Sequence, residues 1–415
     1  MFLIRYVNRM RNIFFILLVL FTISSFCQIE IKGTVYEKNT PLENVAIYLN
    51  NTMLGTTTNI DGTFSLPIKE GQYELIVSYL GYKKIIYPLN TSTYTKPLVF
   101  VLEEDQNILD EIIIQKTVYD EEWHYNLELF KKEFIGLTEL SKDCQILNPE
   151  VLHFDFNGRE NILTAYARKP LQIKNKGLGY LITYELESFI RKKNYVSYLG
   201  YSRYKELKGG KRKKKRWQKN RLKAYNGSVI HFFKSVMNNT FTEEGFIVNQ
   251  FKRVPNPKRP SENTIKKARE LIRLNNVKVY PQNIDQPKNA LDSAFIVIKK
   301  ARLPKFEDYL YKSKLSQNDI ITQKNGLLYL SFDDNLSIVY TKEKEELAYI
   351  TRNTFSKLRE PLPQTSSLIP LKKGIIVDKN GLLIHPLDVF YEEYWSYEKF
   401  ANSLPLDYES VLNKQ

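Results

Sequence analysis

The sequence predicts a mainly β protein with added helices, in which an N-terminal antiparallel β-sandwich precedes an α+β region with an antiparallel meander sheet. Between residues 29 and 103, short strand-like runs alternate with turn residues at the spacing typical of a sandwich. After residue 123, three Asn-Gly dipeptides separate pairs of alternating runs, and this dipeptide is a strong signal of a β-hairpin. Helical spacing interrupts these hairpins, so the second region is expected to combine sheet and helix.

The first 27 residues have the pattern of a secretory signal peptide. Three arginines lead to an unbroken apolar run, Ile13–Phe21. Ser25 and Cys27 then occupy the −3 and −1 positions of a cleavage site before Gln28. The run is too short for a bilayer core, which takes about 20 residues, so export is favoured over an uncleaved anchor or a buried helix. Cys27 also allows a lipid-modified N-terminus, but the bulky Phe26 disfavours it. No later apolar run is long enough to predict a transmembrane helix after cleavage.

The strands expected in the sandwich follow one another closely, and several of them end at residues that favour turns. Asp61-Gly62 is the clearest case, because a hairpin turn needs a positive φ that glycine adopts without steric cost. Glu70-Gly71 and Gly81-Tyr82 end two further runs. The expected strands are Ile29–Val35, Val45–Leu49, Gly55–Thr58, Phe64–Ile68, Tyr73–Tyr79, Lys83–Leu89 and Leu98–Leu102.

Five short motifs in this segment resemble the carboxypeptidase regulatory-like domain of Bacteroidota envelope proteins. They are Ile31–Val35, Pro41–Val45, Gly55–Asn59, Asp61–Phe64 and Leu80–Tyr82. The resemblance implies that residues 28–103 form a seven-stranded, transthyretin-like sandwich. In that family the domain is a structural or interaction module and not a catalytic one.

Residues 104–122 are expected to form a linker, and part of it resembles a known segment. Ile108–Gln115 is similar to the segment that follows the same sandwich in TonB-dependent outer-membrane receptors. There it joins the sandwich to the plug or contacts the energy-transducing partner, which makes Ile112, Ile113 and Ile114 a possible partner strand. An extra strand that pairs with a neighbouring sheet edge explains the same residues, because β-branched runs pair readily. The remaining chain has too few strand-length segments to be such a receptor.

Residues 123–415 are expected to form a region of curved antiparallel sheet with helices over one face or end. Helices are expected at Trp123–Ile135, at Lys211–Asn238 and after the N-cap candidate Ser261. The expected hairpins pair Val151–Phe156 with Ile162–Ala167, Gly179–Ile190 with Tyr195–Tyr201, Ile320–Gln323 with Leu327–Phe332, and Gly374–Asp378 with Leu382–His385.

This second region is similar to the part that accompanies the sandwich in other Bacteroidota proteins, and the likeness implies no particular reaction. It rests on Phe134–Gly136, Cys144–Pro149, Pro170–Tyr180 and Arg216–Tyr225.

The motifs of familiar catalytic sites are missing from the sequence. None of the four histidines stands in the His-x-x-Glu step of a zinc carboxypeptidase, and there is no Cys-x-x-Cys pair or Gly-x-Ser-x-Gly elbow. Neither catalysis nor a metal or cofactor is therefore expected. Adjacent carboxylates such as Glu243-Glu244 leave one alternative open, a hydrolase for cell wall or glycan whose site is assembled from separated residues. Cys144, the one cysteine after the signal, is expected to be buried.

The densest charge in the chain is a basic run that is a possible contact for an anionic surface. The formal net charge is +15, and ten of the residues from 205 to 221 are Lys or Arg. Such density favours exposure, either as a solvated helix face or as a surface that attracts phosphate-bearing lipids. The possible contact residues are Lys211, Arg212, Lys213, Lys214, Lys215 and Arg216.

Together these patterns predict a non-enzymatic, exported protein of the cell envelope, periplasmic or associated with the outer membrane. The expected partner is another envelope protein or an anionic membrane surface, and not nucleic acid, because the compartment excludes it. A hydrolase is the main alternative, and an accessory of a TonB-dependent receptor is a weaker one that rests on residues 108–115.

Overall fold

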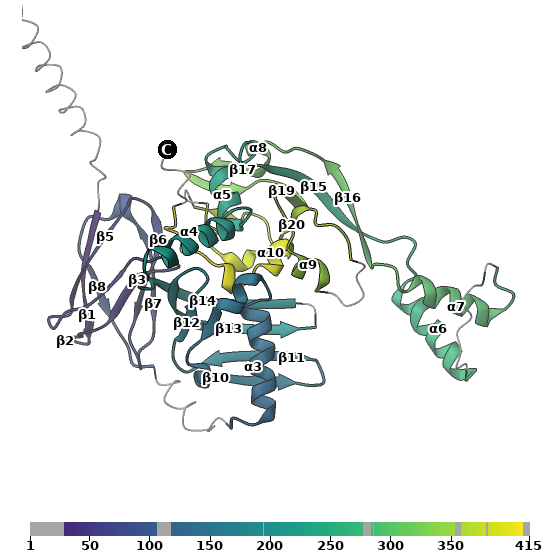
Figure 1. The fold of residues 1–415 in the computed structure, drawn as a ribbon, viewed down its shortest axis with the longest axis horizontal. Coiled ribbons are helices and arrows are strands. Elements are labelled where there is room, and N and C mark those ends of the chain that lie inside the picture. The colour runs from purple at the N-terminus through teal and green to yellow at the C-terminus, as the bar shows by residue number, and fades with distance from the viewer. Residues whose placement is uncertain are drawn as a thin grey trace, which may run out of the picture. The chain divides into compact units, whose positions relative to one another are not determined.

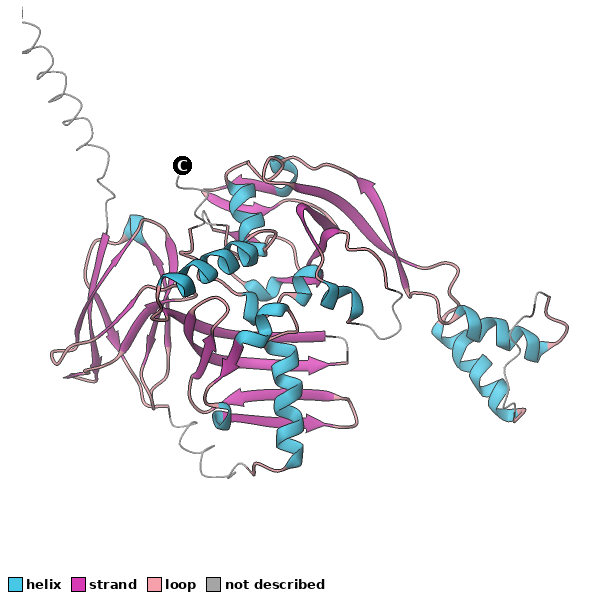
Figure 2. Ribbon diagram, viewed as in Figure 1, coloured by secondary structure: helices cyan, strands magenta, loops and turns pink. Residues whose placement is uncertain are grey.

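The fold is taken from a computed structural model that describes residues 29–105, 118–193, 195–276, 284, 286–352, 358–378 and 381–409. The expected signal peptide and Ile112–Ile114 lie outside these residues. The chain divides into two compact units (Figure 1), the first formed by residues 1–226 and 397–415 and the second by residues 227–396. Strands dominate both units and helices accompany them (Figure 2), so the predicted fold class is confirmed.

The first unit begins with the expected sandwich, but it has eight strands in two four-stranded sheets where seven were expected, because the two-residue strand β2 is added to one sheet. In one sheet β1 lies between β5 and β8, and the short strand β2 also pairs with β1. The other sheet has the order β4-β3-β6-β7. Alternate side chains of β5, from Phe64 to Ile68, are buried between the sheets, as the two-residue period of a strand requires. One pair differs from the antiparallel expectation, because β8 runs parallel to β1. The strands are β1 Ile29–Glu37, β2 Thr40–Pro41, β3 Ala46–Leu49, β4 Gly55–Thr57, β5 Thr63–Ile68, β6 Gln72–Ser78, β7 Ile85–Asn90 and β8 Leu98–Val101.

The rest of the first unit is a six-stranded antiparallel sheet built around the long strand β13. This strand pairs with β14 along one side and with β11 and β12 along the other. Helix α3 crosses one face of the sheet (Figure 1), where Phe130 packs against Phe154 and Phe189. The elements are α3 Glu121–Phe134, β9 Cys144–Ile146, β10 Leu152–Asn157, β11 Ile162–Ala167, β12 Leu171–Asn175, β13 Tyr180–Lys192, β14 Tyr195–Glu206 and α4 Lys211–Tyr225.

The second unit holds a five-stranded sheet of order β16-β15-β19-β20-β22 and a three-stranded sheet of order β17-β18-β21. Helix α5 buries Phe232 and Phe233 in the core of this unit. The elements are α5 Val229–Met237, β15 Phe246–Pro255, α6 Glu262–Leu274, α7 Ala290–Lys300, β16 Phe306–Lys312, α8 Gln317–Ile320, β17 Ile321–Lys324, β18 Leu327–Leu330, β19 Asn335–Lys344, α9 Leu347–Thr351, β20 Pro363–Pro370, β21 Ile376–Val377, β22 Val389–Glu393 and α10 Tyr394–Tyr397.

The last expected hairpin is much shorter than its sequence pattern indicates. Only β21 is a strand, and Leu383 contributes a single bridge to Val377. Main-chain hydrogen bonds still join the two segments, from Asp378 to Leu382 at 2.8 Å and from Ile384 to Ile376 at 3.1 Å, and the Asp378 carboxylate also accepts the Leu382 N–H at 2.7 Å. The strands β15 and β16 were not expected, because α6 and α7 separate them in the sequence.

A main-chain contact joins the sandwich to the edge strand β14 of the six-stranded sheet. The N–H of Asn51 donates to the carbonyl of Ser202 at 2.8 Å, and the N–H of Tyr204 donates to the carbonyl of Thr52 at 2.9 Å. Leu406, in the returning C-terminal segment, donates to the carbonyl of Asn51 at 2.7 Å. The loop that follows β3 therefore covers an edge that would otherwise offer unpaired main-chain groups.

Side-chain contacts extend this junction. Lys84, the residue directly before β7, forms ion pairs with Glu185 and Glu187 of β13. Its Nζ lies 2.7 Å from a Glu185 oxygen. The Tyr48 hydroxyl donates to Glu185 at 2.7 Å. The sandwich is therefore held on the sheet by charged contacts as well as by main-chain pairing.

Candidate functional site

The basic run predicted as a contact surface forms the first half of helix α4. All six residues, Lys211 to Arg216, are exposed. In the part of the chain that the structure describes, the five side chains from Lys211 to Lys215 have no ion-pair partner. The carbonyl of Lys176 accepts a hydrogen bond from Arg216 at 3.1 Å.

The first turns of α4 contain charges that oppose helix formation. Its N-cap, Gly210, provides no side-chain hydrogen bond, and no acidic residue stands in the first turn. Cations at a helix N-terminus are unfavourable because the helix dipole is positive there, and like charges four residues apart repel. Stability of the helix must therefore come from its second half.

The second half of α4 is fixed to the turn that connects β12 with β13. The indole N–H of Trp217 donates to the Lys176 carbonyl at 2.9 Å, Asn220 donates to the Gly177 carbonyl at 2.9 Å, and Arg221 donates to the Leu178 carbonyl at 2.8 Å. Three side chains on one helix face thus satisfy three consecutive carbonyls. This arrangement holds the cationic half of the helix in place from its other end.

Two glycines make room for the Trp217 side chain. Gly179 has a φ of +77°, and a Cβ atom there would lie 2.6 Å from Trp217 Cγ. At Gly209 a Cβ atom would lie 2.5 Å from the far edge of the indole. The neighbouring Arg221 stacks 4.0 Å from the Tyr180 ring centroid and pairs with Glu206. Close packing around Trp217 is the reason that the helix has one defined position.

The charge of the chain is concentrated in this region. Residues 205–223 contain eleven Lys or Arg and one acidic residue, a net charge of +10 against +15 for the whole chain. A fixed array of exposed cations attracts polyanionic surfaces over long range. The arrangement has the charge and the exposure expected of a contact for an anionic surface.

Some of the acidic and histidine side chains that could support a hydrolase are engaged in structural contacts. Within the described ranges, no group of three or more His, Cys, Asp or Glu residues is placed to hold a metal ion. Arg253 makes two-pronged contacts with both Asp308 and Glu392, the first member of the Glu392-Glu393 pair. Burial raises the pKa of Glu393 and raises that of the Cys144 thiol to about 12. Cys144 was expected to be buried, but its side chain is partly exposed.

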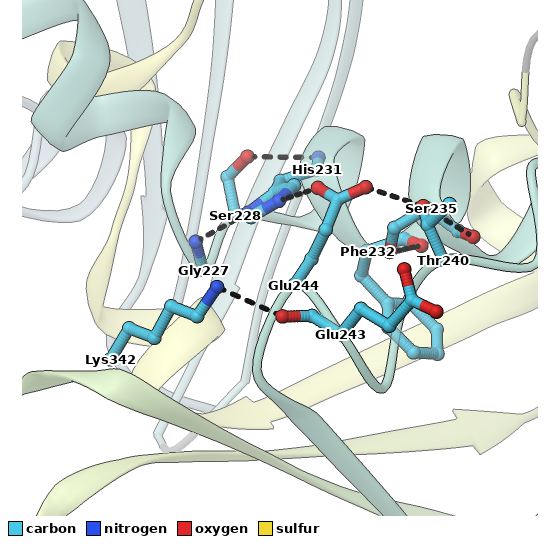
Figure 3. A network of polar contacts seen from close by, with 9 residues as sticks. All are labelled: Gly227, Ser228, His231, Phe232, Ser235, Thr240, Glu243, Glu244 and Lys342. Atoms are coloured by element: carbon cyan, nitrogen blue, oxygen red, sulfur yellow. Dashed lines mark hydrogen bonds and ion pairs between the residues drawn. The ribbon is translucent and has the colours of Figure 1, made fainter. Parts of the chain in front are cut away.

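A buried histidine in the second unit, paired with a partly exposed carboxylate, has a similar structural role (Figure 3). His231 Nδ1 accepts the Gly227 N–H at 3.0 Å, so its proton lies on Nε2 and is donated to Glu244 at 2.6 Å. The Thr240 hydroxyl donates to the other Glu244 oxygen. With both ring nitrogens engaged, His231 connects α5 to the turn before β15 and is not a general base in this arrangement.

Replacement of His231 is expected to reduce the loss of stability in acid. Burial lowers the pKa of His231 below its ordinary value, and the Glu244 carboxylate opposes this only in part. As the pH falls, the unfolded chain therefore binds the proton before the folded protein does. The stability that neutral His231 contributes is complete above about pH 6.5 and is lost as the pH falls through the pKa of His231 in the folded protein. Urea unfolding of the wild type and His231→Gln from pH 8 to 5 measures the difference.

The matched control for this measurement is His385→Gln, which removes an exposed histidine of the same unit. His385→Gln is expected to keep the pH dependence of the wild type. An unchanged slope in His231→Gln would contradict the role given to the buried His231 side chain.

Comparison with known proteins decides what the sandwich is. Residues 31–114 match the family model of the CarboxypepD_reg-like domain. The resemblance expected from the five short motifs is thereby confirmed, and the regulatory-like domain accounts for the first sheets of the fold.

Two curated relatives share this domain region. The chain is 33% identical over 107 residues to a TonB-dependent receptor of Formosa agariphila, covering 24% of this chain and 10% of the relative. It is 30% identical over 98 residues to the TonB-dependent receptor SusC of Bacteroides thetaiotaomicron, covering 23% of this chain and 9% of the relative. The chain therefore spans about a tenth of the length of the curated relatives it matches.

The possible partner strand lies within the match to the regulatory-like domain, although Ile112, Ile113 and Ile114 are outside the described residues. The last described strand before it is β8, which pairs only with β1 and exposes Val99 and Val101. In the described parts of the chain, no helix has the length and apolar content to cross a membrane.

Proposed function

We propose that this chain is a non-enzymatic, exported envelope protein that docks on an anionic membrane surface through the first half of α4. The observation that carries this proposal is that α4 holds five exposed cations, Lys211–Lys215, without ion-pair partners in the described structure. The regulatory-like domain serves as a structural or interaction module. Its curated relatives are receptors by name, which supports an envelope setting, periplasmic or at the outer membrane.

The energetic argument favours a binding role over a folding role for these cations. At the N-terminus of α4 they disfavour the helix, so they are not explained by stability. Near an anionic bilayer each Lys or Arg contributes about 1 kcal/mol of binding free energy. The same residues are therefore unfavourable in the isolated protein and favourable at a membrane.

Neutralising four cations of α4 tests the proposal. Lys211, Arg212, Lys214 and Lys215 are replaced by Gln in the chain from Gln28 onward, and flotation measures binding to phosphatidylcholine vesicles with and without phosphatidylglycerol. Binding to the anionic vesicles is expected to fall by roughly a hundredfold or more. The free energy of unfolding is expected to stay the same or rise by a few tenths of a kcal/mol.

A matched variant controls for net charge. Lys96, Lys193, Lys324 and Lys373 are exposed cations outside α4, and their replacement by Gln removes the same total charge. The control is expected to retain most of the binding. Equal losses in both variants would mean that total charge and not the α4 surface determines binding, and this result would refute the proposal.

A second candidate function is an accessory role beside a TonB-dependent receptor, through Ile112–Ile114. It is supported by the extension of the domain match to residue 114. The test is crosslinking in intact cells, comparing the wild type with Ile112→Asp, Ile113→Asp and Ile114→Asp combined. Loss of a specific receptor adduct in the variant supports this role, and identical adducts exclude it. The hydrolase alternative is not supported by the engaged carboxylates and histidine described above.

A further inference from the structure

A second concentration of positive charge lies far from α4 in the sequence. Residues 256–305 contain twelve Lys or Arg and four Asp or Glu, a net charge of +8. With the +10 of residues 205–223, these two segments exceed the +15 of the whole chain, so the remainder is slightly acidic. The basic character of the protein is therefore confined to two places.

This second basic segment forms an arm of the second unit. Helices α6 and α7 lie side by side at the end of the ribbon of β15 and β16 (Figure 1). A small core joins the two helices, and the N–H of Asn256 donates to the Lys305 carbonyl at 3.0 Å at the base of the arm. The core residues are Ala268, Ile272, Ala294 and Phe295.

Most of the arm's cations are exposed and unpaired among the described residues. Arg259 and Lys305 both pair with Glu262, at 2.9 and 3.2 Å. The exposed cations for which the described structure gives no ion pair are Lys258, Lys266, Lys267, Arg269, Arg273, Lys288, Lys299, Lys300 and Arg302. The small core of the arm does not require these cations, so they are available to contact a surface outside the protein.

Large apolar side chains are exposed beside these cations. Leu274 follows Arg273 and is 69% exposed, and Leu303 follows Arg302 and is 38% exposed. Phe306, at the start of β16, follows Lys305 and is 52% exposed. Cations beside exposed apolar groups fit the headgroup region of a bilayer, where both kinds of side chain are accommodated. An acidic protein surface would account for the exposed cations but not for the exposed apolar side chains beside them.

We propose that the α6–α7 arm is a second membrane contact, which binds the headgroup region of an anionic phospholipid bilayer. The inference extends the proposed function and rests on it for the nature of the surface. The cations of α6 contact phosphate groups, and Leu303 and Phe306 enter the interface at the base of the arm.

The test uses the chain from Gln28 onward and the same two kinds of vesicle. In the arm variant Lys266, Lys267, Arg269 and Arg273 become Gln, and the control again replaces Lys96, Lys193, Lys324 and Lys373. The arm variant is expected to bind phosphatidylglycerol vesicles at least tenfold more weakly than the control. Phe306→Trp adds a probe of insertion, because the three native tryptophans are buried. Its fluorescence is expected to shift to the blue and to be quenched by brominated lipid.

The outcomes separate this inference from the role of α4. Weak binding by the arm variant together with quenching of the new tryptophan supports the arm as a contact, whatever the α4 variant does. Full binding by the arm variant overturns the arm inference, and it leaves the α4 proposal standing only if the α4 variant has lost binding. Unquenched Phe306→Trp overturns the insertion of the base of the arm into the bilayer.

Discussion

Gly179→Ala is expected to lower the free energy of unfolding of the first unit by about 2–5 kcal/mol. The new Cβ atom would lie 2.6 Å from Trp217 Cγ, so either the indole moves or α4 leaves its position. Overpacking of this kind costs about 1–3 kcal/mol, and the left-handed backbone, with a φ of +77°, adds about 1–2 kcal/mol for a residue with a Cβ atom. Urea unfolding followed by far-UV circular dichroism measures the loss.

Gly81→Ala is the matched control for this prediction. Gly81 lies in the same unit and has a φ of +87°, but a Cβ atom there would meet nothing within 4 Å. It is therefore expected to cost only the backbone strain of about 1–2 kcal/mol. If both variants lost the same stability, the contact between Gly179 and Trp217 would not be what positions α4. The same result would remove the structural basis for a fixed basic surface.

Lys84→Ala is expected to destabilise the first unit by about 2–3 kcal/mol and to loosen the sandwich from the six-stranded sheet. The Lys84 side chain is 18% exposed and its partner Glu185 is 11% exposed. Removing Lys84 leaves Glu185 beside Glu187 without the cation between them, and breaking a buried pair by deleting one partner typically costs about 3–5 kcal/mol. Partial exposure reduces this figure. A double-mutant cycle with Glu185→Ala measures the coupling.

The neighbouring residue provides a control within the same turn of the sandwich. Lys83 pairs with Glu103 at 3.1 Å, but these side chains are 56% and 73% exposed. Lys83→Ala is expected to cost less than about 1 kcal/mol, the usual range of exposed ion pairs. A coupling for Lys84 with Glu185 no greater than that for Lys83 with Glu103 would show that the junction does not depend on this contact.

Much of the fold was predictable because its signals are local. Gly62 adopts the expected positive φ, +70°, although its flanking strands β4 and β5 belong to different sheets and do not form the expected hairpin. The run from Phe64 to Ile68 buries alternate side chains. Ser261 caps α6 by accepting the Thr264 N–H at 3.2 Å. Each of these features depends on residues within a few positions of one another, so hydrophobic period and turn chemistry were sufficient.

Features that depend on distant residues were not predictable in the same way. The ribbon of β15 and β16 was missed because each strand's partner is separated from it by two helices. The aromatic residues Tyr391, Tyr394, Trp395, Tyr397 and Phe400 recur at the spacing of one helix face. They are largely buried, but Tyr394 and Trp395 belong to the second unit and Tyr397 and Phe400 to the first. A helical spacing alone gives no information about which core receives each ring.

For this protein, the sequence by itself determined the regulatory-like sandwich, the exposure of the basic run and the lack of a familiar catalytic motif. These follow from strand period, turn residues, charge density and residue type, which are properties of short segments. The tertiary structure alone decided that Trp217 fits against Gly179, that the loop after β3 covers β14, and that the α6–α7 arm presents its charges on a small core of its own. Each of these depends on contacts between residues far apart in the chain, whose pairing is set by shape and hydrogen bonding in three dimensions.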